Sequence, residues 1–194
     1  MTNTTTAPLT RVVNGANLPA PGTFGFDASH TNIGFSVRHM MVAKVRGTFG
    51  EFAGSLTVAD EITDSTVEMT IQAASFSTGD ANRDAHVKSA DFLEVETYPT
   101  LAFKSTSIKP AGGNRYKVTG DFTVRDVTRP LTLDVEFEGV VQDPYGNQRI
   151  GFSATGEINR EEFGVKFNAA LETGGVVVSS TVKLEIEAEA VRQA

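Results

Sequence analysis

The chain has 194 residues, of which 40% are hydrophobic and 21% charged, a composition typical of a soluble globular domain. Its formal net charge of −7 argues against general binding to nucleic acids or to anionic membranes, since both favour a basic protein face. The chain contains no cysteine, which excludes disulfides, thiol nucleophiles and cysteine-ligated zinc.

Residues 1–22 are rich in Thr, Asn and Pro, so they are predicted to bury little surface and to form a mobile tail. The folded domain is expected at residues 23–194. The chain does not open with the charged and then apolar regions of a signal peptide, and a cytoplasmic location is therefore expected. No window approaches 18 consecutive apolar residues, the length that a membrane-spanning helix needs.

From Thr23 onward, apolar and polar residues alternate, which predicts strands with one buried and one solvated face. In the clearest segment, one face carries Leu131, Leu133, Val135, Phe137 and Val141. The pattern predicts nine antiparallel strands, at residues 23–28, 31–39, 46–58, 65–76, 100–108, 115–125, 128–142, 148–160 and 176–190. Their length and sequential order favour an all-β fold, a long-stranded up-and-down β-barrel with one or two short helices in its loops. A two-sheet sandwich is the alternative.

The segment "ANRDAHVKSADF", Ala81–Phe92, is the one convincingly helical stretch, with Asp80 as its N-cap. Its polar residues suggest a metal site, an acid–base site, a polar rim around a pocket, a solvated helix between two strands, or a structural role in pinning a long connection to the barrel. Arg83 and Asp84 are adjacent and do not face each other on a helix, so each needs a partner elsewhere.

The two ends of the barrel are expected to differ. In a simple meander, one end receives the break at Ala28–His30 and three short turns. The other end receives Met40–Arg46, the long segment 77–99, a short turn and residues 161–175. Long connections in compact domains tend to carry function, so this second end is the candidate mouth.

The three histidines are predicted not to form one site. His30 and His39 are separated by roughly 30 Å of strand, at about 3.4 Å per residue, which excludes a three-histidine zinc site. His39 and His86 are expected at the same end. With a carboxylate from Asp84 or Asp91 they give the alternative hypothesis, a small enzyme or metal-dependent protein. No tight ligand spacing supports a metal cofactor, and none is expected.

No known catalytic motif favours an enzyme. The chain lacks the nucleophile elbow of hydrolases, the phosphate-binding P-loop and the glycine-rich dinucleotide fingerprint. Catalytic residues are therefore not expected.

The segment from Thr31 to Gly50 is locally basic in an acidic chain. It contains no acid, while Arg38, Lys44 and Arg46 flank the apolar "MMV". The segment is interpreted either as a solvated loop or as a lid, in which Met side chains adapt to an apolar ligand and cations hold its head group.

Five blocks in order resemble the YceI-like, polyisoprenoid-binding family. They are "FDASHTNIGFSVRH", "GTFGEFAGSL", "SFSTGDANRDAHVKSADFLEVETYPTLAFKS", "VTGDFTVRDVTRPLTL" and "GFSATGEINREEFG", within residues 24–190. The resemblance implies a lipocalin-like barrel around a long apolar channel. It also implies binding of an isoprenoid lipid, such as an isoprenoid quinone or a polyprenyl phosphate, without catalysis. Residues 83–92 carry the family's Arg-Asp-x-His-x-x-Ser-x-Asp-Phe motif.

Two groups of site residues follow. The predicted ligand channel comprises Phe35, Val37, Phe103, Phe122, Leu133, Phe137 and Phe152. The predicted polar rim comprises Arg38, His39, Arg83, Asp84, His86 and Arg160. The expected partner is the lipid ligand, with no nucleic acid and no stable membrane insertion. A homodimer stays open, as does a dimeric stress-response scaffold whose barrel is filled by its own core.

Overall fold

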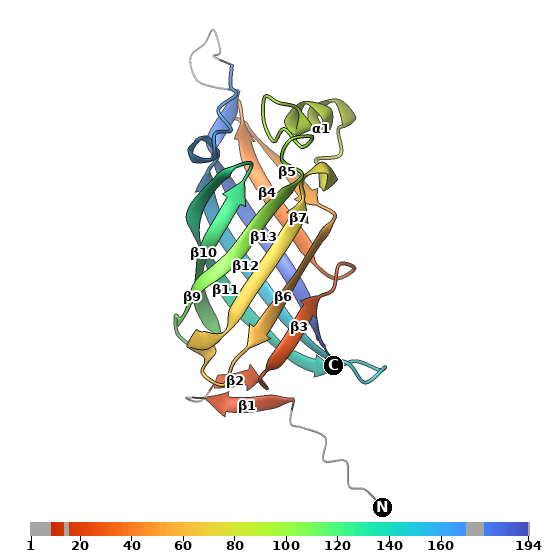
Figure 1. Cartoon of the computed structure of the whole chain (residues 1–194), viewed down its shortest axis with the longest axis vertical. Coiled ribbons are helices and arrows are strands. Elements are labelled where there is room, and N and C mark those ends of the chain that lie inside the picture. The colour runs from red at the N-terminus through yellow and green to blue at the C-terminus, as the bar shows by residue number, and fades with distance from the viewer. Residues whose placement is uncertain (1–8, 14–15, 170–176, 194) are drawn as a thin grey trace, which may run out of the picture.

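The computed structural model of the protein describes residues 9–13, 16–169 and 177–193. Long antiparallel strands form a closed eight-stranded barrel, which stands upright in Figure 1. The predicted all-β barrel is thus confirmed, and the sandwich alternative is wrong. The strands are β1 (Thr10–Val13), β2 (Ala16–Pro19), β3 (Gly22–Phe26), β4 (Asn32–His39), β5 (Ala43–Phe49), β6 (Phe52–Val58), β7 (Thr66–Gln72), β8 (Phe76–Ser77), β9 (Thr100–Pro110), β10 (Arg115–Val124), β11 (Val127–Gln142), β12 (Gln148–Asn159) and β13 (Val178–Arg192).

The described helices are short. They are the α-helix α1 (Ala81–Lys88) and three 3-10 helices, η1 (Ile62–Asp64), η2 (Ala73–Ser75) and η3 (Arg160–Phe163). The N-cap prediction is correct, because the Asp80 side chain accepts a hydrogen bond from the Arg83 main-chain N–H at 2.9 Å. None of these helices is long and apolar enough to cross a membrane.

Most of the barrel is the predicted meander, but its first part differs. Strands β6, β7, β9, β10, β11, β12 and β13 are neighbours in that order, and β13 also pairs with β3 and β4. Both β3 and β4 run antiparallel to β13, so they run in the same direction as two halves of one bent strand. The break at Ala28–His30 therefore bends the chain without reversing it. In the same way, the predicted strand 46–58 divides at Gly50–Glu51 into β5 and β6.

The inner face of the barrel follows the alternation in the sequence except at bulges, one of which lies between Ser105 and Ser107 of β9 and another in β11. The register between β11 and β12 shifts between Phe137 and Gly139, where a bulge adds one residue to β11. Because a single added residue moves the following side chains to the opposite face, Val140 packs against the core and Val141 is 60% exposed. The prediction that Val141 faces inward is wrong for this reason.

The lower end of the barrel in Figure 1 is crossed by the β1–β2 hairpin. Leu18 is only 3% exposed, and Ala20 is also buried. Gln148 donates a hydrogen bond to the carbonyl oxygen of Leu9 at 2.6 Å, which fastens the hairpin to β12. The prediction that residues 1–22 bury little surface is therefore wrong for Leu18–Ala20, while residues 1–8 and 14–15 lie outside the described residues.

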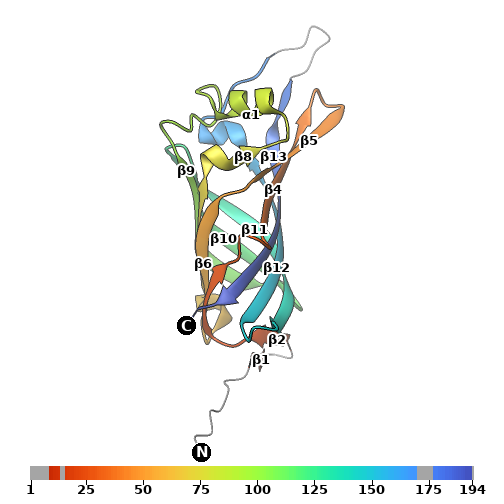
Figure 2. The same cartoon turned by 90° about the vertical axis from the view of Figure 1, so that its right-hand side faces the viewer.

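The opposite end carries the long connections. Helix α1 and its flanking segments lie over this end, beside the tip of the β4–β5 hairpin (Figure 2). His39, which ends β4, and His86, which belongs to α1, are therefore at the same end, as predicted.

Candidate functional site

The barrel encloses a cavity of about 200 Å³ whose surface is apolar throughout. Strands from both halves of the chain line the cavity. Its surface is apolar because the inward side of each long strand is the apolar side. Six of the seven predicted channel residues line this cavity: Phe35, Phe103, Phe122, Leu133, Phe137 and Phe152. Val37 does not line it. It lies further along β4 toward the mouth, between Val45 and Val182 on the neighbouring strands.

The floor of the cavity comes from a segment that the composition did not mark as structural. Leu18 and Pro19 of β2 line the cavity, together with Ile62 of η1. The only local signal was a Leu next to a Pro within a polar stretch. These residues close the lower end of the cavity.

Three phenylalanines pack together where β4, β5 and β8 meet. The rings of Phe35 and Phe76 are stacked with centroids 5.1 Å apart, and Phe49 lies 5.8 Å from Phe35 and 5.7 Å from Phe76. The cavity is smaller than the roughly 300–1,000 Å³ usual for small-molecule sites. A long apolar ligand therefore requires side chains such as these rings to move.

The connection before α1 is held by Asp84. Its carboxylate accepts hydrogen bonds from the Thr78 main-chain N–H at 2.9 Å, the Thr78 hydroxyl at 2.5 Å and the Ser77 hydroxyl at 3.1 Å. Burial raises the pKa of Asp84, but the hydrogen bonds from Thr78 and Ser77 together outweigh burial and lower it. Asp84 therefore has a structural role, because its carboxylate oxygens are already hydrogen-bonded to Thr78 and Ser77.

Arg83 and His86 are also engaged within this segment. Arg83 donates to the hydroxyl of Thr78 at 2.7 Å and to its carbonyl oxygen at 3.3 Å. His86 Nε2 lies 2.8 Å from a carboxylate oxygen of Asp91, and the His86 ring meets Phe92 and Phe167 edge to face. The motif at residues 83–92 therefore bonds largely to itself and its neighbours, which favours the pinning interpretation.

Arg160 fastens a second connection to the barrel. Its side chain is 5% exposed. Its guanidinium donates to the carbonyl oxygens of Val165 at 2.6 Å, Ser179 at 3.0 Å, Phe167 at 2.9 Å and Val178 at 3.2 Å. Burial lowers the pKa of Arg160, and the charge of Glu161 partly opposes that effect. The predicted rim role of Arg160 is not supported, because its donors point at main-chain oxygens.

The remaining two rim residues lie on the β4–β5 hairpin. Arg38 is exposed and sits directly opposite Lys44, on the outward side of the strand pair. His39 is half-buried, between Ala43 on β5 and Val178 on β13. Of the six predicted rim residues, His39 is thus half-buried at the end of β4, while His86 is exposed and packs on Phe92 and Phe167.

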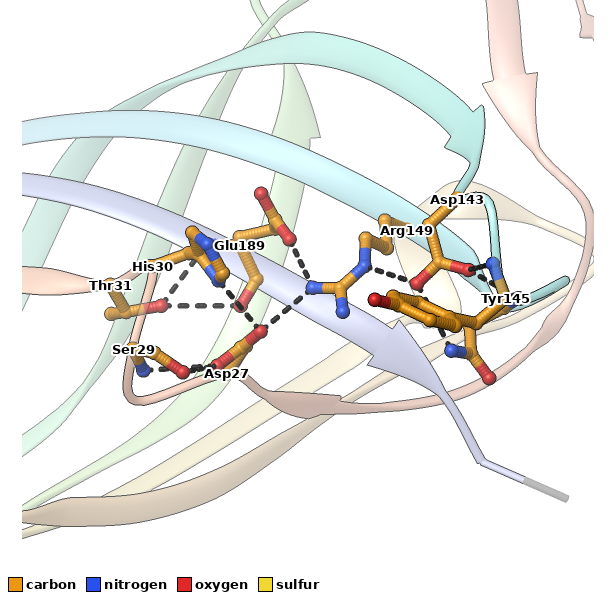
Figure 3. A network of polar contacts seen from close by, with 9 residues as sticks. Asp27, Ser29, His30, Thr31, Asp143, Tyr145, Arg149 and Glu189 are labelled. Carbon is orange, nitrogen blue, oxygen red and sulfur yellow. Dashed lines mark hydrogen bonds and ion pairs between the residues drawn. The ribbon is translucent and has the colours of Figure 1, made fainter.

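A second polar cluster lies on the lower wall of the barrel (Figure 3). Arg149 donates to Asp27 at 2.7 Å, to Asp143 at 2.8 Å and to Glu189, and His30 lies 2.9 Å from Asp27. Possible metal-ligand atoms of Asp27, His30 and Glu189 lie within 4.8 Å of one another. The Arg149 guanidinium already supplies positive charge to both carboxylates, so the cluster is better described as a clamp on the β3–β4 bend.

No other group of three or more potential metal ligands occurs in the described part of the chain. In particular, His39 and His86 are not brought together with a carboxylate into one such group. The alternative hypothesis of a metal-dependent protein therefore loses the site on which it was based.

Replacing Arg149 by glutamine should destabilise the protein at neutral pH and make its stability less dependent on pH in the acid range. Hydrogen bonds from Arg149 are the largest cause that holds the pKa values of Asp27 and Asp143 well below their usual range. Carboxyls with lowered folded-state pKa values add stability above about pH 4, and this stability is lost as pH falls through the folded values. We expect the stability difference between wild type and variant to be full at pH 7 and to shrink below about pH 4.

Urea unfolding between pH 7 and pH 2 measures this difference. Arg115→Gln is the matched control, since Arg115 is an exposed arginine at the start of β10. Parallel stability curves of wild type and Arg149→Gln at every pH would contradict the prediction.

Comparison with known proteins agrees with the geometry. The chain matches the family model described as "YceI-like domain" over residues 24–190. A UPF0312 protein of Staphylococcus aureus is 41% identical over 170 residues, which cover 86% of this chain and 95% of the relative.

Solved structures show the same barrel. The crystal structure of Burkholderia cenocepacia BcnA has a TM-score of 0.73 at 26% identity and covers 84% of this chain and 98% of its own. The YceI protein of Campylobacter jejuni has a TM-score of 0.69 at 28% identity, with coverages of 87% and 96%. A structure described as a polyisoprenoid binding domain from Saccharophagus degradans has a TM-score of 0.65 at 15% identity, with coverages of 90% and 100%, a likeness of fold alone.

Proposed function

The chain belongs to the YceI-like domain family, and we propose that it binds and carries an isoprenoid lipid in the barrel cavity without catalysing a reaction. The observation that carries this proposal is the apolar cavity, closed at one end by Leu18 and Pro19. The description of the Saccharophagus degradans neighbour as polyisoprenoid-binding supports the ligand class. The scaffold hypothesis, with a barrel filled by its own core, is less consistent with an apolar cavity inside the barrel.

The apolar chain of the ligand is expected to dominate affinity. Burying a five-carbon unit contributes at most roughly 4 kcal/mol, at about 0.8 kcal/mol per carbon. Eight such units would exceed the practical ceiling near 18–21 kcal/mol, so chain ordering and the movement of cavity side chains offset much of the gain. The head group then serves mainly to select among ligands with similar chains.

We infer an uncharged or weakly polar head group, such as that of an isoprenoid quinone. A polyprenyl phosphate would need inward-facing cations. Arg38 is on the outer face of its hairpin, Arg83 is bonded to Thr78, and Arg160 is bonded to main-chain carbonyls. The cavity surface itself offers no polar atom to an anion.

A salt titration tests the head group. Binding of a quinone should stay nearly flat between about 0.01 M and 1 M salt, because burial of an apolar chain is not screened. Binding of a chain-matched polyprenyl pyrophosphate through rim cations should weaken over the same range, as the Debye length falls from roughly 30 Å to 3 Å. A clear preference for the pyrophosphate that disappears at high salt would contradict the uncharged head group.

Organic extraction of the purified protein, followed by mass spectrometry, tests the function itself. We expect a long-chain isoprenoid lipid in the extract. Metal analysis on the same sample addresses the alternative hypothesis, which requires a stoichiometric metal. A cytoplasmic site of action stays a prediction that cell fractionation would test.

A further inference from the structure

The β4–β5 hairpin ends in an exposed apolar tip at the mouth of the barrel (Figure 2). Met40, Met41 and Val42 are 42%, 62% and 82% exposed. The main-chain N–H of Val42 donates to the carbonyl oxygen of His39 at 3.2 Å, which closes the turn. Three apolar side chains in a row thus face water at the point of the molecule where the long connections also lie.

The backbone of this tip is unfavourable for the residues that occupy it. Met40 and Met41 have φ values of 49° and 60°, in the left-handed region. Hairpin turns with two such residues usually carry Asn and Gly, which adopt this conformation at little cost. The sequence therefore places two flexible apolar side chains where folding alone favours Asn-Gly.

The outer face of the same hairpin is basic. Arg38 is paired directly with Lys44, and Arg46 is paired with Ser36 two residues further along the ladder. Like charges opposite each other on antiparallel strands are destabilising. All three cations are exposed, and none of them makes an ion pair within the part of the chain that the structure describes. An external anionic surface would attract all three cations and so offset the repulsion between them.

We propose that the β4–β5 hairpin docks the barrel mouth onto an anionic lipid surface. Met40, Met41 and Val42 enter the boundary between head groups and acyl chains, and Arg38, Lys44 and Arg46 contact the anionic head groups. Exposed apolar side chains flanked by basic residues are the combination that binds such an interface. In the docked orientation, the mouth of the barrel faces the hydrocarbon region of the membrane, in which apolar lipids dissolve. The isoprenoid ligand of the proposed function can then pass from the membrane directly into the barrel.

The net charge of −7 opposes docking only weakly in this orientation. At about 0.1 M salt, charges more than roughly 10 Å from the lipid surface are largely screened, so the acidic lower wall contributes little. At the mouth end, the charge of Glu94 is balanced by its ion pair with Arg125. The docked orientation thus presents the basic hairpin to the lipid and keeps the acidic lower wall away from it.

Vesicle flotation with the full chain tests the proposal. The vesicles contain phosphatidylcholine with or without phosphatidylglycerol, and no isoprenoid, so that docking is separated from ligand binding. We expect binding to the anionic vesicles that falls with salt and is at least about tenfold weaker on phosphatidylcholine alone, given roughly a fivefold contribution from each basic residue.

Two hairpin variants separate the apolar and the basic contributions. Met40→Asn with Met41→Gly supplies the residues that the turn prefers, so the fold should be kept or strengthened, yet vesicle binding should fall by at least about tenfold. Arg38→Gln with Lys44→Gln should lower binding to anionic vesicles by roughly 25-fold and leave binding to phosphatidylcholine unchanged.

Val141→Ser is the matched control, because Val141 is 60% exposed at the other end of the barrel, and its vesicle binding should equal that of the wild type. Equal wild-type binding to both kinds of vesicle, no binding at all, or hairpin variants that bind like the wild type would overturn the proposal. Quinone binding measured without vesicles would be unaffected by each of these results, which keeps failure of docking distinct from failure of the proposed function.

Discussion

Ala154→Phe is expected to reduce the affinity for a long-chain isoprenoid quinone by at least about 100-fold, while the barrel still folds. Ala154 lies midway along β12, between Val135 and Ile186, and its side chain lines the cavity. A phenyl ring at this position occupies space that the lipid chain needs. Displacing a single five-carbon unit removes up to about 4 kcal/mol of burial, which corresponds to nearly a thousandfold in affinity.

The matched control places the same substitution on the outside of the barrel. Ala53 on β6 is exposed, so Ala53→Phe should leave quinone affinity unchanged. Adding bulk to the interior costs roughly 1–3 kcal/mol of stability, and thermal unfolding of both variants shows whether the barrel remains folded. A folded Ala154→Phe protein with wild-type affinity would mean that the lipid chain is bound outside the cavity.

The alternation of apolar and polar residues was sufficient to predict the long strands of the second half of the chain. The predicted strand 148–160 is observed as Gln148–Asn159, and 115–125 as Arg115–Val124. Alternation reports which face is buried, but it does not report the direction of a strand. The bend between β3 and β4 was therefore predicted as a reversal, and the bulge before Gly139 was missed.

The same limit explains which parts of the candidate site were predicted. Strand parity is enough to place Phe103 or Phe152 on the inner wall. The floor at Leu18 depends on where a short hairpin packs in three dimensions, which its local composition does not encode. Polar residues such as Arg83 and Arg160 have the same sequence signature whether they meet a ligand or a main-chain carbonyl. Their partners lie on segments that the sequence alone cannot bring together, such as Val178 for Arg160.

Arg160→Ala is expected to lower the free energy of unfolding by about 3–5 kcal/mol, the largest loss of stability among the substitutions considered. The guanidinium satisfies four main-chain carbonyls from two separate segments, at Val165, Phe167, Val178 and Ser179. A buried acceptor left without a donor costs roughly 1–3 kcal/mol. The Val165 oxygen loses its donor in a buried setting, whereas the Val178 oxygen keeps the Asn168 side-chain amide at 2.8 Å, so the four costs do not add fully. For a chain of this length, the loss corresponds to a drop in Tm of roughly 6–20 °C.

Arg160→Lys and Arg115→Ala are the controls for this experiment. Lysine keeps the charge but has three donors on one nitrogen, so it should recover only part of the stability. Arg115→Ala removes an exposed arginine and should change Tm little. A Tm of Arg160→Ala equal to that of Arg115→Ala would contradict the assigned role of Arg160.

The loss should extend to ligand binding, because the connection that Arg160 holds reaches the cavity wall. Phe163, in the same 3-10 helix, is 2% exposed and packs edge to face against Phe122 at 5.6 Å. Phe122 in turn lines the cavity. Releasing the connection removes the support behind this ring, so quinone affinity of Arg160→Ala should fall even at temperatures where the barrel remains folded. Unchanged affinity in the folded variant would show that Phe122 holds its position without the connection that Arg160 fastens.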